Sequence, residues 1–304
     1  MTPCWDGLLL LDKPPGPTSH DIVDRVRRAT HTRRVGHAGT LDPPATGLLV
    51  AVLGRATRLV RFLPDAPKGY SGTFRLGVTT ATDDLTGATL TRHDGPLPAH
   101  EQVVSAAARF VGSLLQTPPS ISARSVGGKR LYRLARRGRA VTAPAVRVQV
   151  ERLEIEPLAE PGLYAFSAEV SAGTYVRSLV RDLGWALECG AAVDTLRRTR
   201  IGPLGVEDAL LVSPDGPIDR EEARRRLVPI DGMPFALPGV VARHEDAEAL
   251  FLAGRPVEPE GEGFPASGLV VVRSGAGRVI GVGEVLGGLV RPRVALALPP
   301  ADRL

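Results

Sequence analysis

Cysteine is scarce in this chain of 304 residues, which has only Cys4 and Cys189, far apart in the sequence. Two such residues form neither a disulfide framework nor the closely spaced pairs that bind metals. We therefore expect a reducing, cytoplasmic setting. No apolar run approaches the roughly 20 residues of a membrane helix. Residues 1–16 also lack the basic start and the cleavage site of a secretory signal, so we expect no membrane association and no export.

Motifs of several enzyme classes are absent as well. The sequence has no HExxH or CxxC motif, and its six histidines do not stand at ligand spacing from cysteines or carboxylates. The glycine-rich loop at residues 36–43 lacks the GK[ST] ending of a phosphate-binding loop. No GxSxG nucleophile motif is present. These absences predict that the protein has no metal site and no nucleotide-hydrolysing site.

Basic residues are abundant, and their distribution is uneven. Arginine makes up 35 of the 38 basic residues, which a bias toward GC-rich codons largely explains. Residues 121–142 hold seven basic side chains and no acidic one, and residues 25–34 hold five arginines and no acid. Residues 240–304, by contrast, hold seven basic and eight acidic residues. A solvated charged face usually mixes the signs, whereas clustered positive charge binds polyanions. The pattern favours a nucleic-acid partner.

Hydrophobic periodicity predicts an α+β fold in two units. Strands are expected at 7–13, 47–53, 70–78, 146–155 and 163–170, and helices at 18–29, 56–63, 98–112, 174–190 and around 129–138. Thr18 is the expected N-cap of the first helix, and Asp21 completes a capping box. A stretch rich in proline and charge at 213–239 is the expected linker to a final unit with one helix, 245–253, and three strands.

The stretch GHAGTLDPPATG, residues 36–47, holds His37 and Asp42 between a predicted helix and a predicted buried strand. Turn formation alone could account for Asp42, but loops of this kind often carry catalytic groups. A carboxylate without an evident partner carboxylate suits nucleophilic catalysis better than paired acid–base work. Arg177 lies near the apolar face of the helix predicted at 174–190, so it needs a carboxylate partner, and Asp42 is one candidate. Such a pair would keep Asp42 ionised.

Six stretches follow one another in a recognisable order over nearly the whole chain. They are GLLLLDKPPGPTSHD, RVGHAGTLDPPATGLL, KGYSGTFRLG, TPPSISA, SAGTYVRSLVRDLG and LRRTRIG. In these stretches the chain resembles the TruB family of tRNA pseudouridine synthases. The resemblance implies a pseudouridine synthase fold, with a mixed, largely antiparallel central sheet flanked by helices, over residues 1–232. Residues 236–304 resemble a small β-rich PUA module, which binds RNA.

The resemblance also implies a reaction, the isomerisation of uridine 55 in the T loop of tRNA, without cofactor or metal. Asp42 would be the catalytic aspartate, Tyr70 would pack on the target base and is the candidate general base, and Arg177 would pair with Asp42. Lys13 and Pro14 would support the active-site loop. Substrate-binding roles fall on His37, Asp84, Leu196, Arg124, Lys129 and Arg130, the last three in a basic segment, 121–142, that would bind the T arm.

The chain departs from the family pattern at a few positions. Ile121 and Ser125 stand where a YSAxK run is common, and Ala81 stands where the family's acidic turn has aspartate. These changes affect RNA contacts rather than the nucleophile. We expect a monomer without a protein partner.

Several alternatives stay open at this stage. The basic segment and the PUA-like unit also suit a non-catalytic protein that binds or folds tRNA, and a nucleosidase would also use a carboxylate. Tyr70 could be an ordinary strand residue and His37 an ordinary loop residue. Asp42 could attack the sugar or the base, or stabilise a sugar cation; in a glycal route Tyr70 would remove the C2′ proton.

Overall fold

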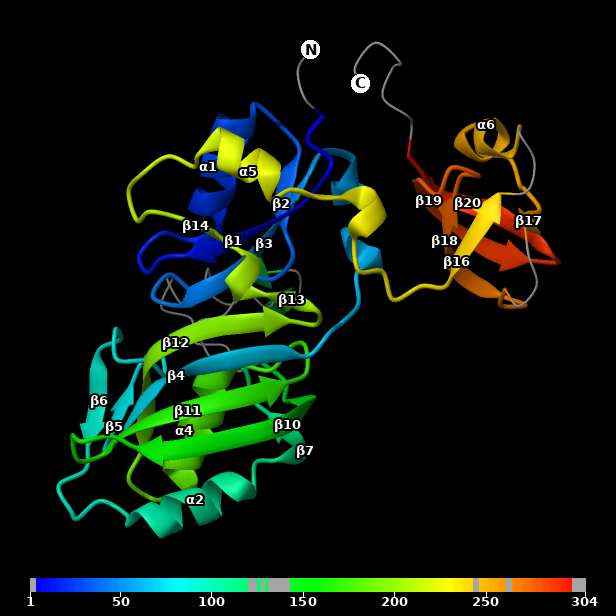
Figure 1. Ribbon diagram of the computed structural model, residues 1–304. Helices are drawn as coiled ribbons and strands as arrows, with labels where there is room; N and C mark the ends of the chain where they lie inside the picture. Colours follow the sequence, from blue (N-terminus) through cyan, green and yellow to red (C-terminus); the bar gives the residue numbers. More distant parts are fainter. Residues whose placement is uncertain are drawn as a thin grey trace.

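The structure, a computed structural model, describes residues 4–119, 125–126, 129–130, 143–242, 246–260 and 264–296. These residues form an 11-stranded sheet and a separate 5-stranded sheet, with two short two-stranded pairs. Figure 1 shows the large sheet with its helices as one lobe and the small sheet as a second lobe. No helix in the described ranges combines the length and apolar character needed to span a bilayer.

The large sheet is mixed and largely antiparallel, as predicted. Its main path runs β14–β1–β3–β12–β4–β11–β10–β7. The strands on this path are β1 (Gly7–Lys13), β3 (Thr46–Leu53), β4 (Lys68–Leu76), β7 (Gly112–Gln116), β10 (Val146–Pro157), β11 (Leu163–Val170), β12 (Ala191–Ile201) and β14 (Leu210–Leu211), and β2 (Val35–His37), β13 (Leu204–Gly205) and β15 (Val228–Pro229) pair beside them. The β1–β14 and β3–β12 pairs are parallel. The β3–β12 pair therefore joins two antiparallel halves.

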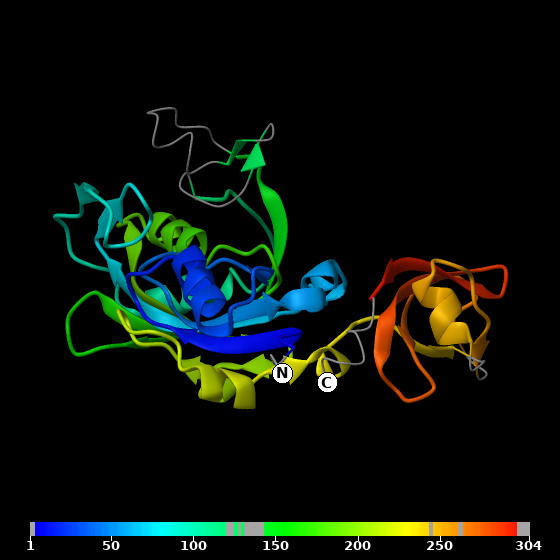
Figure 2. The same ribbon diagram turned by 90° about the horizontal axis from the view of Figure 1, so that it is seen from above.

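Helices α1 (Ser19–Thr30) and α4 (Val176–Ala186) lie on the same face of this sheet (Figure 2). The predicted capping box of α1 is present, since Thr18 Oγ1 accepts from the Asp21 amide at 3.1 Å and Asp21 Oδ2 accepts from the Thr18 amide at 2.8 Å. Helix α2 (His100–Ala108) packs beside α4 in the core of β4, β10 and β11. Both α2 and α4 are shorter than predicted.

Strand β1 is buried on both faces. Leu9 and Leu11 belong to a core that includes α1, whereas Leu8 and Leu10 pack in another cluster with Met233 and with residues of the small sheet. A strand covered on both sides has a continuous apolar sequence rather than an alternating one. This explains the runs GLLLL and GLLVAVL in β1 and β3.

The small sheet has the order β17–β16–β18–β19–β20. Its strands are β16 (Gly239–Ala242), β17 (Pro259–Glu260), β18 (Gly268–Arg273), β19 (Val279–Leu286) and β20 (Leu289–Ala295), with helix α6 (Ala247–Leu252) beside them. The predicted helix and three strands are present, and β16 and β17 are additional. Asp231 Oδ1 accepts from the Val279 amide at 2.6 Å and joins the small sheet to the segment before it.

Two predictions about local structure are wrong. The stretch 213–239 is not a plain linker, because it contains α5 (Arg220–Arg225) and β15 and buries Ile218, Ala223 and Met233. The helix predicted at 56–63 consists of two 3₁₀ turns, Gly54–Arg58 and Val60–Phe62, in a segment too short for a stable α-helix.

The helix predicted around 129–138 is also wrong where the structure describes it. Lys129–Arg130 is a short strand, β9, which pairs with β8 (Ser125–Val126). Residues 131–138 lie outside the described residues. A second small hairpin, β5 (Val78–Thr80) with β6 (Thr89–Arg92), frames the turn that carries Asp84.

Candidate active site

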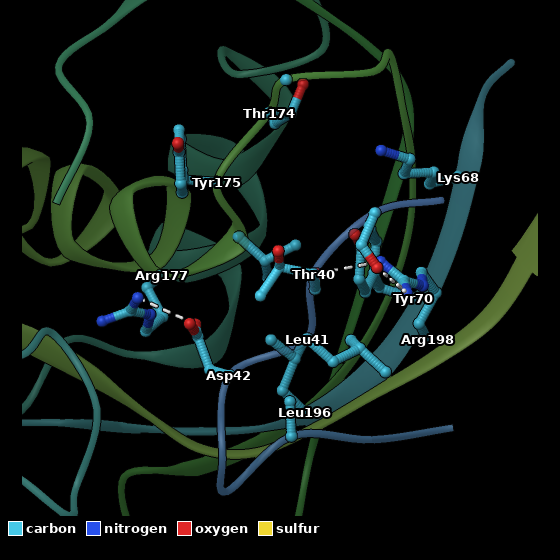
Figure 3. A pocket seen from close by; sticks show the side chains of 14 residues that line it. Thr40, Leu41, Asp42, Lys68, Tyr70, Thr174, Tyr175, Arg177, Leu196 and Arg198 are labelled. Atoms are coloured by element: carbon cyan, nitrogen blue, oxygen red, sulfur yellow. Dashed lines mark hydrogen bonds and ion pairs between the residues drawn. The ribbon is translucent and has the colours of Figure 1, made fainter. Parts of the chain in front are cut away.

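A cavity of about 350 Å³ opens where β3, β12 and β4 meet the start of α4. Four of the predicted site residues line it: Asp42, Tyr70, Arg177 and Leu196 (Figure 3). They come from the loop before β3, from β4, from α4 and from β12. The fold thus assembles one site from distant parts of the sequence.

The predicted ion pair is present in the cavity. Arg177 Nη2 lies 2.8 Å from Asp42 Oδ2, and the Arg177 side chain is only 7% exposed whereas that of Asp42 is 40% exposed. Arg177 Nη1 also donates to the Thr82 carbonyl oxygen at 2.6 Å. The contact with Thr82 fixes the guanidinium of Arg177, which in turn binds the carboxylate of Asp42 at the edge of the cavity. Figure 3 shows the Arg177–Asp42 pair.

Asp84 lies behind Arg177 and not among the residues that line the cavity. Its Oδ2 is 3.6 Å from Arg177 Nη1. Its Oδ1 accepts from Thr82 Oγ1 at 2.8 Å and from the amide of Thr86 at 3.1 Å. The Leu85 amide ties this turn to Val193 of β12 at 2.8 Å. Asp84 thus lies beside Arg177, and it lines a smaller adjoining cavity together with Asp42, Arg177 and Leu196.

Lys13 is fully buried beneath the loop that carries Asp42. Its Nζ donates to the carbonyl oxygens of Pro14, Pro43 and Ala45 at 2.9, 3.0 and 2.8 Å. Burial lowers the pKa of Lys13 to about 8, although the negative charge of Asp42 opposes this change. An ammonium has three donors, and here all three are used. The contacts with Pro14 and with both sides of Pro44 agree with the predicted support of the loop.

Arg198 holds the other end of the same loop, and it was not predicted. Its side chain is buried on β12, where Nε donates to the Leu48 carbonyl at 2.8 Å. Nη2 and Nη1 donate to the carbonyl oxygens of Gly39 and Thr40 at 3.1 and 3.3 Å. Alternation along β12 places Arg198 on the same face as Leu196, which is the sequence signal that points to it.

Ser19 adds a contact from the first turn of α1. Its hydroxyl donates to the Leu41 carbonyl oxygen at 3.0 Å and accepts from the Leu41 amide at 2.9 Å. The residue immediately before Asp42 is thereby fixed to a helix whose start is itself capped. Three elements, β1, α1 and β12, therefore define the path of the loop.

The opposite wall of the cavity is formed by β4 and by the start of α4. Lys68 and Tyr70 are two residues apart on β4 and line the cavity together. Tyr175 precedes α4, and its amide donates to Oε1 of the buried Gln116 at 2.8 Å. Lys68 was not predicted as a site residue, since a single lysine in a strand carries no motif.

One predicted substrate-binding residue, His37, is not among the residues that line this cavity. It ends β2 and pairs with Ala51 of β3. The prediction for Arg124 falls outside the described residues, and Lys129 and Arg130 are described only as backbone in β9. In the part of the chain that the structure describes, no group of three or more His, Cys, Asp or Glu side chains is placed to hold a metal ion.

The fold and the site together define a class of enzyme. A mixed sheet with a central parallel pair, and an aspartate in the loop before that pair that binds an arginine and faces a tyrosine across a cavity, is the arrangement of a pseudouridine synthase, an isomerase.

Comparisons with known proteins agree with this class. Residues 27–176 match the family model "TruB family pseudouridylate synthase (N terminal domain)", and residues 177–231 match "tRNA pseudouridylate synthase B C-terminal domain". The chain is similar to "tRNA pseudouridine synthase B" of Thermotoga maritima, with 38% identity over 91% of this chain and 89% of the relative. The protein of the same name from Mycolicibacterium paratuberculosis is 46% identical to this chain, over 67% of this chain and 70% of the relative's own length.

Among solved structures, the "Crystal Structure of a Cbf5-Nop10-Gar1 Complex" contains a similar chain. The TM-score is 0.68 at 26% identity, over 96% of this chain and 85% of that one. The chain belongs to the TruB family of pseudouridylate synthases.

Proposed function

We propose that this protein converts uridine 55 in the T loop of tRNA to pseudouridine. The observation that carries the proposal is the carboxylate of Asp42, held 2.8 Å from the buried guanidinium of Arg177 in a cavity that Tyr70 also lines. The names of the curated relatives, tRNA pseudouridine synthase B, support tRNA as the substrate. The position within the T loop rests on the ordered motifs of the sequence.

The proposed reaction conserves all atoms of the base and the sugar. The bond between N1 and C1′ breaks, the uracil rotates, and a bond forms between C1′ and C5. The proton on C5 leaves to solvent, and N1 takes up a proton from solvent. Asp42 acts by attack on the sugar or the base, or by stabilising a sugar cation. In the glycal route Tyr70 removes the C2′ proton.

Positioning is the main task of the surrounding residues in this proposal. A reacting carboxylate must be held in near-attack geometry, and an error of about 1 Å can cost about 100-fold in rate. Lys13 and Arg198 donate to six carbonyl oxygens in all. Four of these, on Gly39, Thr40, Pro43 and Ala45, lie in the loop on the two sides of Asp42. Asp84 holds Arg177. Leu196 lines the pocket for the base.

RNA binding involves parts of the chain further from the cavity. The target uridine must be flipped out of its stack at a cost of a few kcal/mol, and His37 would lie in the loop that holds the RNA open. Arg124, Lys129 and Arg130, in the basic segment 121–142, would bind phosphates of the T arm. We propose residues 1–232 as the catalytic unit and residues 236–304 as a PUA-like RNA-binding unit of a cytoplasmic monomer.

Tritium release tests the proposal directly. Transcripts of tRNA carrying 5-tritiated uridine are incubated with the wild type, with Asp42→Asn and with the matched control Asp24→Asn, which changes a carboxylate on the outer part of α1. We expect release from the wild type and the control, and a loss of at least about 10⁴-fold for Asp42→Asn. Replacement of uridine 55 should abolish release. Equal release by Asp42→Asn, or none by the wild type, would refute the proposal.

A further inference from the structure

Lys68, which is half-buried, differs from the buried cations around the cavity because its ammonium makes no hydrogen bond or ion pair within the described ranges. No hydrogen bond and no ion pair joins Lys68 Nζ to a described residue. Lys13 and Arg198, by comparison, each donate to three carbonyl oxygens. Within the described ranges, the ammonium of Lys68 therefore makes none of the loop contacts that Lys13 and Arg198 make.

The surroundings of Lys68 are unfavourable for a cation. Burial and the nearby positive charge of Arg198 lower the pKa of Lys68, and the carboxylate of Asp65 offsets this only in part. Placing an ammonium in a partly desolvated position without a partner costs free energy. An anionic ligand would recover that cost, which is the usual reason for an unpaired cation in a site.

The position of Lys68 is suited to a group attached to the reacting nucleotide. Lys68 and Tyr70 project from the same face of β4, and Figure 3 shows Lys68 on the opposite side of the cavity from Asp42 and Arg177. Lys68 also lines an adjoining cavity of about 260 Å³. Gly39 lines both cavities, and a Cβ on Gly39 would lie 4.0 Å from Lys68 Nζ. The ammonium is therefore at the junction of the two cavities.

We propose that Lys68 binds a phosphodiester of the RNA next to the flipped uridine and so positions that nucleotide over Asp42. The inference rests on the proposed function, because it takes RNA as the substrate. A phosphate is the anion that every nucleotide carries next to its sugar, and lysine binds it as a point charge. The main chemical competitor is a hydrogen bond from Lys68 to a carbonyl oxygen of the uracil, which would act on the leaving base.

Steady-state kinetics separate these two roles. We compare Lys68→Met and Lys68→Arg with the wild type on T-arm RNA, and we use Arg109→Met, at the end of α2, as a control that removes one positive charge outside the cavity. We expect Lys68→Met to raise KM about tenfold, to leave kcat within about twofold, and to reduce the slope of log KM against log salt by about one. Lys68→Arg should restore most of the loss, and Arg109→Met should stay within about twofold.

A chemically altered RNA identifies the phosphate itself. Single methylphosphonate linkages, which are neutral, are placed on either side of uridine 55. At the linkage that Lys68 binds, the substitution should raise the KM of the wild type about tenfold. It should leave the KM of Lys68→Met unchanged, because this variant lacks the ammonium. A fall in kcat with unchanged KM and salt slope would overturn the proposal in favour of a contact with the base. The proposal would also be overturned if, at both linkages, the methylphosphonate and the Lys68→Met substitution raised KM independently of each other.

Two controls keep the result interpretable. Lys68→Met removes an unpaired charge, so its melting temperature should equal or exceed that of the wild type. Failure of the proposed function would be distinct, because the wild type would then release no tritium from any transcript. Failure of the Lys68 inference alone would leave turnover by the wild type intact and give Lys68→Met the kinetics of the wild type.

Discussion

Lys13 lies beneath the loop that forms one wall of the cavity and Lys68 lines the facing wall, and the two lysines differ in the partners of their ammonium groups. Lys13 is beneath the Asp42 loop, fully buried, with all three donors used by carbonyl oxygens. Lys68 is on β4, partly exposed, with no such contact to a described residue. The first arrangement fixes the backbone that carries Asp42. The second leaves a charge available to a ligand.

The two arginines extend the comparison. Arg198, like Lys13, donates to the loop backbone, whereas Arg177 donates to the Asp42 carboxylate and to the turn that carries Asp84. The loop wall of the cavity is therefore a paired network, and we expect substitutions there to affect kcat and stability. On the β4 wall we expect substitutions to affect KM.

After replacement of Asp42 itself, replacement of Arg177 is expected to have the largest effect on the paired wall. Arg177→Met leaves Asp42 and the buried Asp84 facing each other without a countercharge. We expect kcat to fall by about 10³-fold and the free energy of unfolding to fall by about 3 kcal/mol. The measurements are single-turnover tritium release and urea denaturation.

The double variant Arg177→Met/Asp84→Asn separates the two effects of Arg177. It removes the unpaired buried charge, so stability should recover while activity stays low. Recovery of activity in the double variant would show that Arg177 acts only on stability, and would contradict its proposed role beside Asp42.

Replacement of Arg198 tests the fixing of the loop. Arg198→Met leaves the carbonyl oxygens of Gly39, Thr40 and Leu48 without their donor. We expect the loop to shift and the single-turnover rate at saturating RNA to fall about 100-fold, with the Kd for RNA within about threefold. The matched control is Arg197→Met, which removes the neighbouring, partly exposed pair with Asp12. An equal loss in both variants would mean that charge alone, and not the loop contacts, matters.

The pH dependence of stability gives the smallest expected effect. The pKa of Lys13 is about 8 in the fold and near its ordinary value of 10.5 in the unfolded chain. Between these values the unfolded state binds more protons, so the free energy of unfolding rises with pH. Relative to Lys13→Met, the wild type should gain about 2 kcal/mol between pH 7.5 and 9.5, as measured by urea denaturation. If the free energy of unfolding of the wild type instead falls relative to that of Lys13→Met as the pH rises, the three carbonyl contacts favour the ammonium more than burial disfavours it.

Features of the fold that rest on a sequence motif were predictable, and those that rest on burial against distant elements were not. The capping box at Thr18 and Asp21 is set by neighbouring residues, so its sequence pattern is sufficient. The structure of 218–233 depends on burial of Ile218, Ala223 and Met233 against distant elements, which a proline-rich composition hides.

The site follows the same division between residues that stand in a motif and residues that do not. The pairing of Arg177 with Asp42 was predictable, because the family motifs implied it and a guanidinium near an apolar helix face needs an acceptor, for which Asp42 was one candidate. The role of Arg198 was not, since its acceptors are backbone carbonyls and every residue has one. Asp84 was selected correctly as a residue near the site, but its placement behind Arg177 depends on the bridge between its turn and β12.

Strand β12 has a further consequence for the order in which the protein acquires its shape. It lies between β3 and β4, although both of those strands are synthesised long before it. Until residues 191–201 leave the ribosome, β1 with β3 and β4 with β11 have no strand in common. The arrival of β12 joins these two halves, and the same strand brings Arg198 to the loop. A nascent chain can therefore be largely structured and still have no active site.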